Sequence, residues 1–506
     1  MNNKSKNILR GIILTSYVLI LSLVLYGVAA VFSYLNTGAD RSAMLHTEVK
    51  QVDQYLPQLE WAPLTNEGRP MDKENLKAIE DDYLDAWYVR HVAYMTNNMK
   101  GIDDFFTESA RENISNIIDI NSENNTRIEA TTLEHHPNLE FFSEDGQLAV
   151  LTDHDVVEYK RIFKGENLIA EINEKSTYKV TLLLEDGFWR IRHLVRVESE
   201  PYSAPKHTSI AKTITIKGIN YYPQATPWNM YGDDFDIDVI SKDFEIIKSA
   251  GLNSIRIFVP YEDFGKSSVA PDKLEKLKNV LDQAEAQNLK VLVTLFDFYG
   301  EYSVLDWSLT QRHAETIVNN IKSHNALLGW DIKNEPNLDF ENRSKALVLA
   351  WLDKMIDFVK SQDPDHPITI GWSNVESGEL LKDKLDFISF HYYEDQNKLE
   401  NKYTSLKSKL NHKPLVITEY GISSYSGLWN PLGNSEDDQA EYHKKMQETF
   451  SKNNIQFMSW TLYDFVEIPK EVVGRLPWRQ NAQKRFGFID ESGTKKPSFQ
   501  YISTKE

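Results

Sequence analysis

The stretch that decides the fold reads "LLGWDIKNEP", residues 327–336. Its first part is largely apolar, as in strands that are buried on both faces of a parallel sheet. Its end is polar, because Asn334 and Glu335 stand side by side just before Pro336, a residue that helps to turn the chain away. A carboxyl group at the tip of a buried strand must be solvated, paired with another group or used in chemistry.

Seven more stretches of this kind follow residue 212: "TITIKGINYY", "LNSIRIFVP", "LKVLVTLFD", "PITIGWS", "LDFISFHYY", "PLVITEYG" and "IQFMSWTLYDF". Helical patterns separate them, at residues 234–250, 271–288, 310–324, 343–362, 398–410 and 436–453, with a shorter one near 376–382. Strands alternating with helices over about 250 residues predict a (β/α)8 barrel. A doubly wound open sheet is the alternative. It is less favoured because no glycine-rich phosphate loop follows the first strand and eight regular units favour closure.

Every predicted strand ends in polar or aromatic side chains, and in such a barrel these ends share one face. In chain order they are Asn220, Tyr221 and Tyr222; Arg256; Asp297; Asn334 and Glu335; Trp372 and Asn374; His391 and Tyr393; Glu419 and Tyr420; and Trp460, Tyr463 and Asp464. A structural core would have to supply a partner for each buried polar group. The pattern therefore predicts an active site at this face.

Two glutamates stand out, Glu335 on the fourth strand and Glu419 on the seventh, because their carboxyl groups can face each other across the barrel mouth. Cleavage of a glycosidic bond needs such a pair, one group to protonate the leaving oxygen and one to attack or stabilise the anomeric carbon. A separation of about 5–5.5 Å implies retention of configuration and about 6.5–9.5 Å implies inversion. The sequence leaves that distance open.

Asn-Glu-Pro at 334–336 and "VITEYG" at 416–421, taken together at this spacing, resemble the motifs of retaining (β/α)8 glycoside hydrolases with glutamates on strands four and seven. Residues from about 212 to 500 look most like family 5, the cellulase and mannanase relatives, and "KGINYYPQATPW" is also similar to family 2 barrels. The resemblance implies a glycosidase (EC 3.2.1.-) for β-linked oligo- or polysaccharides, with no cofactor. We expect no metal site, because His135, His136 and His412 show no ligand spacing with other metal-binding residues.

The resemblance also implies roles for individual residues. Glu335 would be the acid/base and Glu419 the nucleophile that forms a covalent glycosyl-enzyme. The supporting contacts would be Asn334 on the sugar 2-hydroxyl, Arg256 and Tyr393 on Glu419, His391 beside Glu335, and Trp460 beneath the reacting sugar.

One departure concerns the third strand. Many family 5 members place a histidine near its end, whereas this chain has "TLFDFYG", so that Asp297 or Tyr299 would occupy the region. We expect Asp297 to support substrate binding. The remaining aromatic candidates are either sugar platforms or core: Trp228, Trp307, Trp372 and Trp429.

The sequence before the barrel has a different pattern of apolar and polar residues. Residues 72–198 begin with helical spacing from Asp72 and again over about 102–118, and continue with four strand-like runs. Turn signals at residues 144–146 and 185–187 predict hairpins. This α+β pattern resembles the nuclear-transport-factor-2-like (NTF2-like) cone fold. Residues 199–211, with two prolines, read as a linker to the barrel domain at 212–506.

The first 35 residues predict a membrane anchor. Lys4, Lys6 and Arg10 precede an uncharged run over residues 11–35, long enough to span a bilayer. The basic flank should stay in the cytoplasm and place the rest outside the cytoplasmic membrane. A cleaved signal peptide ending near Ala30 is the alternative, but apolar regions of signal peptides are shorter. Residues 36–71, with three prolines, would form a stem.

Composition narrows the function classes. The net charge of −19 over 506 residues argues against a nucleic-acid partner, and the lack of cysteine excludes disulfides and thiolate chemistry. We therefore expect a membrane-anchored retaining glycosidase linked to exopolysaccharide metabolism, with a polysaccharide synthase or export system as a further partner. A transglycosylase with the same residues and a carbohydrate-binding scaffold are the alternatives.

Overall fold

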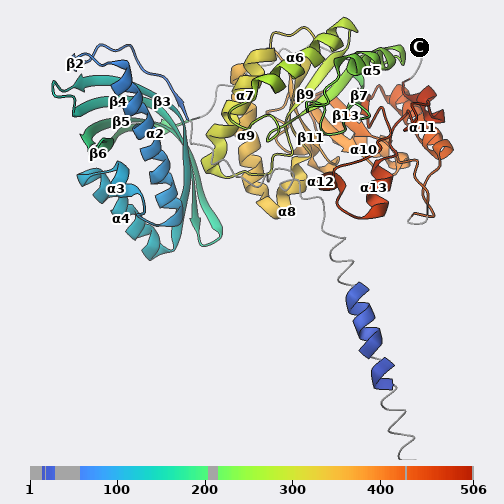
Figure 1. The fold of residues 1–506 in the computed structure, drawn as a ribbon, viewed down its shortest axis with the longest axis horizontal. Helices are drawn as coiled ribbons and strands as arrows, with labels where there is room; N and C mark the ends of the chain where they lie inside the picture. Colours follow the sequence, from blue (N-terminus) through green and yellow to red (C-terminus); the bar gives the residue numbers. More distant parts are fainter. Residues whose placement is uncertain (1–13, 18, 29–56, 203–214, 428–429, 504–506) are drawn as a thin grey trace, which may run out of the picture.

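The computed structural model describes residues 14–17, 19–28, 57–202, 215–427 and 430–503. Two folded domains are visible in Figure 1: a first domain formed by residues 57–202 and a barrel formed by residues 215–503. The greater part of the predicted linker lies outside the described residues.

The barrel is closed and all of its strand pairs are parallel, in the order β10-β11-β12-β13-β14-β7-β8-β9. The predicted (β/α)8 barrel is thus confirmed. Its strands are β7 (Lys217–Asn220), β8 (Ser254–Pro260), β9 (Lys290–Asp297), β10 (Leu327–Asn334), β11 (Ile368–Trp372), β12 (Ile388–Tyr392), β13 (Leu415–Tyr420) and β14 (Gln456–Ser459).

The long helices follow the predicted stretches: α5 (Ile237–Ser249), α6 (Pro271–Ala286), α7 (Trp307–Ile321), α9 (Lys345–Gln362), α10 (Leu399–Ser408) and α11 (Glu436–Asn453). Between β11 and β12 the segment predicted near 376–382 is only a 3-10 turn, η4 (Glu376–Glu379). Further short helices lie in the loops: α8 (Phe340–Arg343), α12 (Lys470–Val473) and α13 (Pro477–Gln483).

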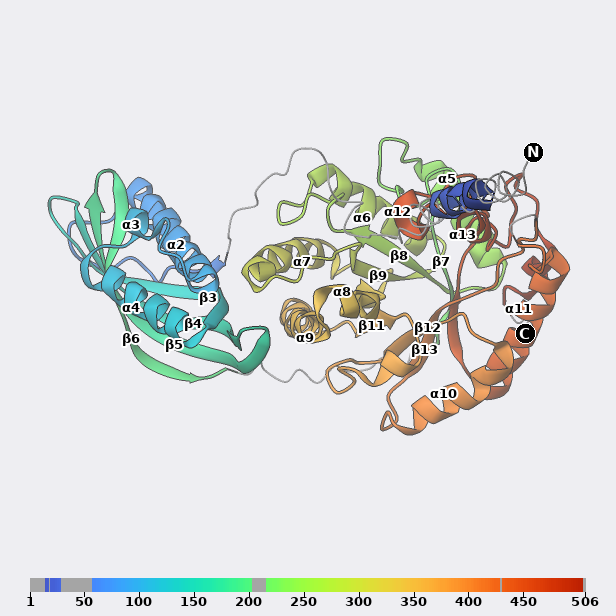
Figure 2. The same ribbon diagram turned by 90° about the horizontal axis from the view of Figure 1, so that it is seen from below.

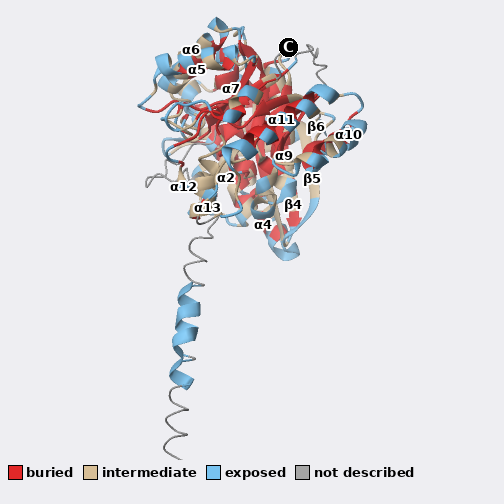
Figure 3. Ribbon diagram, turned by 90° about the vertical axis from the view of Figure 1, so that its right-hand side faces the viewer, coloured by how far each residue is buried: buried red, intermediate tan, exposed pale blue. Residues whose placement is uncertain are grey.

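Burial explains the continuous apolar runs. Every residue of β8, β11, β12 and β13 is buried, since one face of each strand packs inside the barrel and the other against the helices. Figure 3 shows the buried residues gathered at the centre, with exposed residues on the outer helical surfaces. Even the indole nitrogen of Trp330, on β10, is satisfied, donating to Asp363 Oδ2 over 2.8 Å.

The first domain is an α+β unit, as predicted. Its sheet has the order β1-β3-β4-β5-β6, with β2 paired to β3. Three helices lie against it (Figure 1). The elements are β1 (Gln58–Leu59), β2 (Glu67–Gly68), α2 (Lys73–Thr96), α3 (Ile102–Phe105), α4 (Glu108–Asn124), β3 (Thr126–Phe142), β4 (Leu148–Lys164), β5 (Asn167–Glu185) and β6 (Phe188–Pro201).

Local sequence explains the boundaries. Asp72 caps α2 by accepting from the Asn75 amide, and Gly187 has a φ of +87° in the turn between β5 and β6. The structure differs from the prediction over residues 57–71, because β1 and β2 extend the sheet where a stem was expected. The prolines there exclude a long helix but not two-residue strands. The resemblance to the NTF2-like fold stays a prediction.

The predicted anchor over residues 1–35 lies partly outside the described residues. Residues 14–17 and 19–28 are helical and exposed. Within the described residues, the structure holds no helix whose length and apolar character suffice to cross a membrane.

Candidate active site

Several of the strand-end residues meet around Arg256, whereas Tyr221 packs outward on α5 and Tyr420 on α11. The Arg256 guanidinium is fully buried and donates to Glu419 Oε1 (2.6 Å), Asn220 Oδ1 (3.0 Å), Asn334 Oδ1 (2.9 Å) and twice to Asp331 Oδ2 (3.0 and 2.6 Å). Burial disfavours its charge, but the Asp331 and Glu419 carboxylates outweigh burial and raise the pKa of Arg256. Five hydrogen bonds match the five N–H groups of an arginine, so the side chain has one orientation.

The two glutamates form a close pair. One carboxyl oxygen of Glu335 and one of Glu419 lie within 4.8 Å of each other, together with a ring nitrogen of His391. Glu419, on β13, is buried, whereas Glu335, directly after β10, is partly exposed. The structure therefore brings together the two carboxyl groups that the sequence predicted, with one more open to solvent than the other.

Glu335 has an unusual backbone, with a φ of +47°. Its amide donates to the Gly371 carbonyl over 2.7 Å, which ties the residue to the neighbouring strand β11. A non-glycine residue in the left-handed region costs about 1–3 kcal/mol and persists only where surrounding contacts hold it. This backbone conformation changes the direction of the chain at Glu335, directly after the strand.

Two further predicted residues contact the pair. His391 Nδ1 lies 2.9 Å from Glu335 Oε1 and 3.4 Å from Glu419 Oε2. The Tyr393 hydroxyl donates to Glu419 Oε2 over 2.9 Å, and desolvation together with the Glu419 carboxylate raises the pKa of Tyr393 well above its usual value. Tyr393 therefore remains a hydrogen-bond donor, and Glu419 is held on both oxygens, by Arg256 and by Tyr393.

An aromatic wall adjoins Arg256. Trp460 and Trp228 lie 5.9 Å apart between ring centres, and Tyr222 stacks on Phe258 at 5.2 Å. Arg256 lies over the Phe258 ring, 4.6 Å from its centre, so the wall adjoins the hydrogen-bond network. The indole N–H of Trp460 is buried and has no acceptor among the described residues. The role of Trp460 as a sugar platform stays a prediction.

Asp331 belongs to the site although it was not among the predicted site residues. It is completely buried and accepts from both Arg256 and Thr294 Oγ1 (2.8 Å), while its other oxygen accepts from the Gly371 amide (2.8 Å). The sequence does contain an indication of this role, because a carboxyl group in the middle of "LLGWDIKNEP" needs a buried partner. Asp331 holds the side of the guanidinium that faces away from Glu419.

Asp297 and Tyr299 lie near the end of the third strand, where many other family members have a histidine. Asp297 Oδ2 accepts from the Tyr222 hydroxyl over 3.4 Å, so Asp297 contacts the aromatic wall, and its support of substrate binding stays a prediction. Tyr299 packs instead on Trp351, with ring centres 4.8 Å apart, and is core. Among the predicted platforms, Trp228 belongs to the wall, Trp307 and Trp372 are buried core residues, and Trp429 lies outside the described residues.

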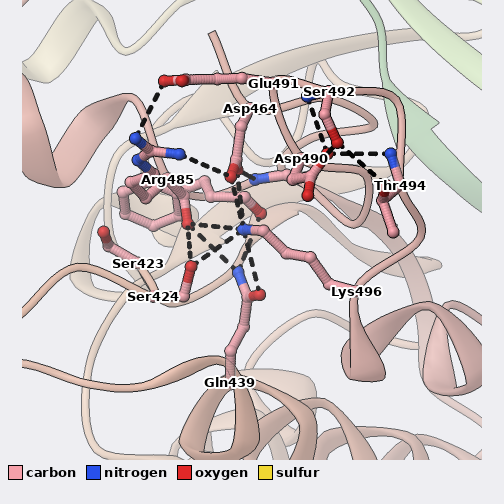
Figure 4. Close-up of polar contacts among 12 residues, drawn as sticks. Ser423, Ser424, Gln439, Asp464, Arg485, Asp490, Glu491, Ser492, Thr494 and Lys496 are labelled. Atoms are coloured by element: carbon pink, nitrogen blue, oxygen red, sulfur yellow. Dashed lines mark hydrogen bonds and ion pairs between the residues drawn. The ribbon is translucent and has the colours of Figure 1, made fainter.

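A buried ion pair supports the loop that follows Trp460 (Figure 4). Lys496 Nζ lies 2.8 Å from Asp464 and 2.9 Å from Ser424 Oγ, while the Gly487 amide donates to Asp464 over 2.8 Å. Lys496 and Asp464 are both buried, so removal of either would leave an uncompensated charge. Asp464, predicted at a strand end, thus holds Lys496, and Lys496 contacts Ser424 in the loop after β13.

Comparison with known proteins places the barrel in one family. The family described as "Cellulase (glycosyl hydrolase family 5)" matches residues 212–465. Mannan endo-1,4-beta-mannosidase A of Emericella nidulans is 22% identical over 263 residues, which cover 40% of this chain and 67% of the mannosidase. The human beta-glucuronidase is 24% identical over 300 residues, covering 55% of this chain and 43% of that enzyme. The chain thus spans less than half of the glucuronidase.

The similar solved structures have low sequence identity to this chain. An exo-beta-1,4-mannosidase from Opitutaceae bacterium strain TAV5 is 17% identical with a TM-score of 0.46, covering 58% of this chain and 59% of that one. A family 5 (GH5_18) protein from Streptomyces cattleya, in complex with GlcNAc, is 15% identical with a TM-score of 0.45, covering 56% and 78%.

Proposed function

The chain belongs to glycosyl hydrolase family 5 and is a glycosidase, and on that premise we propose that it cleaves β-linked glycans with retention of configuration. The observation that carries the proposal is the distance of at most 4.8 Å between an oxygen of Glu335 and an oxygen of Glu419. Inverting enzymes keep the two groups about 6.5–9.5 Å apart to admit a water molecule between sugar and base. The close pair favours direct attack by one carboxylate.

The hydrogen bonds assign the two roles. Glu419 receives donors on both oxygens, from Arg256 and Tyr393, which stabilises a carboxylate in a fixed orientation. Glu335 is more exposed and contacts His391, so it can reach a leaving group that departs towards solvent. In the first step Glu419 bonds to the anomeric carbon, the glycosidic bond breaks, and Glu335 gives its proton to the departing oxygen.

The second step releases the sugar. The ionised Glu335 takes a proton from water, the water oxygen bonds to the anomeric carbon, and the bond to Glu419 breaks. Two displacements at the same carbon restore the original configuration. Asn334, held by Arg256, lies next to Glu335 and would bind the sugar 2-hydroxyl during both steps.

The hydrogen bonds of Arg256 favour a substrate without a carboxylate group. The proteins to which this chain is similar include a mannosidase and a glucuronidase, and of their substrates only a glucuronide carries a carboxylate that calls for a cation. All five N–H groups of Arg256 are already engaged by four protein side chains, and none is left for a substrate carboxylate. We therefore propose β-mannosides and related neutral β-glycosides as substrates.

The stereochemical test is direct. Hydrolysis of an activated aryl β-mannoside or β-glucoside, followed by proton NMR from the first minutes, should show the β-anomer of the free sugar before mutarotation. An α-anomer as first product would contradict retention. Glu419→Ala protein purified in parallel controls for host glycosidases. Added alcohol acceptors separate hydrolysis from transglycosylation, because a transglycosylase converts them to β-glycosides.

For location, we propose that residues 11–35 anchor the chain in the cytoplasmic membrane with the barrel outside. Support comes from the uncharged run and its basic flank. The full chain should sediment with membranes after carbonate washing, and the barrel should become accessible to protease in spheroplasts. A variant with Lys4, Lys6 and Arg10 changed to glutamate should lose this orientation. Recovery of the full chain in the soluble fraction would contradict the proposal.

A further inference from the structure

The first domain packs on the barrel through a continuous buried contact. Tyr159, on β4, stacks on Trp307, the first residue of α7, with ring centres 4.4 Å apart and planes inclined by 28°. Both rings are buried, and the neighbouring side chains Leu133 and Val157 belong to the same core as the barrel. Figures 1 and 2 show α7 and α9 on the side of the barrel that faces this domain.

Two polar contacts lie at the edge of this stack. Arg312, on α7, donates to the Pro57 carbonyl over 3.3 Å, so the chain just before β1 is part of the contact. The Lys354 amino group, on α9, lies 5.5 Å from the centre of the Tyr159 ring. The contact therefore extends over two barrel helices and combines an apolar centre with a polar edge, as a specific interface does.

From Trp307 a series of hydrogen bonds leads to the active site. The Trp307 indole donates to the Tyr302 carbonyl over 3.2 Å, and the Tyr302 hydroxyl donates to Asp339 Oδ2 over 2.5 Å. Asp339 also lies 3.4 Å from Nζ of Lys333, a buried cation on β10. Asp339 ends the 3-10 turn η3 (Pro336–Asp339), which starts directly after Glu335.

An ion pair thus joins two residues that flank Glu335 in the sequence. Lys333 precedes it by two residues and Asp339 follows it by four, and their ion pair closes the turn that holds Glu335 at a φ of +47°. Such a backbone needs surrounding contacts to persist. The loop that carries Tyr302 and Trp307 supplies one of these contacts, and the first domain covers that loop through Tyr159.

We propose that the first domain is an intramolecular support for the acid/base glutamate, acting through Tyr159, Trp307, Tyr302 and Asp339. These are positioning residues, because they act on Glu335 through the turn η3 and the ion pair between Asp339 and Lys333. The inference rests on the proposed function, since it assumes that Glu335 protonates the leaving group. It assigns the first domain a role in catalysis rather than in glycan binding.

The test exploits the leaving group. Cleavage of an aryl glycoside with a strongly acidic phenol needs little protonation, whereas a weakly acidic phenol or an alcohol depends on the general acid, a contribution of about 10²–10⁴ in rate. In the full chain, Tyr159→Ala should lower kcat/KM about tenfold or more for poor leaving groups and at most about threefold for good ones. KM should change little, because the substrate contacts stay in place.

Three variants make the outcome decisive. Tyr159→Phe should behave like the parent, because the ring stack on Trp307 is kept. Val195→Ala, on the exposed side of the same domain, is the matched control. Tyr302→Phe removes the hydroxyl that donates to Asp339 and keeps the ring. It should show the same dependence on the leaving group if Tyr159→Ala fails to fold.

The results that would contradict the inference differ from those that would contradict the proposed role of Glu335. Equal losses for good and poor leaving groups in Tyr159→Ala and Tyr302→Phe would reduce the contact to general stability and overturn the inference. Unchanged rates in both variants would do the same. If Glu335→Ala itself showed no dependence on the leaving group, the assignment of Glu335 as general acid would fail instead.

Discussion

Glu419→Ala should lower kcat on aryl β-glycosides by about 10⁴ or more, with correct folding retained. The substitution removes the group that bonds to the anomeric carbon, and no other carboxylate is held by both Arg256 and Tyr393 among the described residues. Loss of a nucleophile in other enzymes costs a comparable factor of about 10⁴–10⁶. Steady-state kinetics and the melting temperature measure the two quantities side by side.

Azide distinguishes the two glutamates. In Glu419→Ala the small anion can enter the space left by the carboxylate and attack from the same face, so that a single displacement yields the α-glycosyl azide. In Glu335→Ala the glycosyl-enzyme still forms from substrates with good leaving groups, and azide then yields the β-glycosyl azide. The opposite pattern would exchange the assigned roles. Glu400→Ala, at a surface ion pair with Lys452, should be fully active.

Gly371→Ala should lower kcat by about 10²–10³ although residue 371 bears no functional group. A Cβ atom at this position would lie 2.7 Å from Arg256 Nη2, 3.2 Å from Asp331 Oδ2 and 3.3 Å from His391 Nε2. These three side chains are buried and engaged, so the guanidinium must shift and release Glu419 from its orientation. Misplacement of about 1 Å can cost a factor of 10².

The control for this prediction is Ile370→Val on the same strand. Loss of one buried methylene costs about 0.5–1.5 kcal/mol, so the variant should melt at a lower temperature while kcat stays near the parent value. Gly371→Ala should instead lose activity out of proportion to any change in melting temperature. Parent-like kcat in Gly371→Ala would show that the network has room for the methyl group.

Much of the site could be predicted because catalytic side chains follow strand ends. Glu335, Glu419 and Arg256 stand at positions that the (β/α)8 pattern brings to one face, and their contacts in the structure agree with the predicted ones. His391 and Tyr393 likewise lie where the end of their strand predicts. A continuous apolar run that ends in polar residues is a local property, and it can therefore be recognised in the sequence alone.

Other features depend on distances that no local pattern contains. Asp331 and Gly371 take their importance from the close approach of β8, β10 and β11, which only the closed sheet creates. Trp307 was one of four possible sugar platforms, but its partner Tyr159 comes from a separate domain 148 positions earlier. A stacking contact of this kind is invisible until both domains are folded.

By itself, the amino-acid sequence determined the barrel, the carboxyl pair and the arginine that serves it, because hydrophobic periodicity sets strand ends and strand ends set the active face. The tertiary structure decided three things: that the carboxyl oxygens lie within 4.8 Å, that Arg256 has no free N–H group, and that the first domain contacts the loop beside Glu335. Each is a distance between segments remote in sequence, and such distances exist only after the chain has closed on itself.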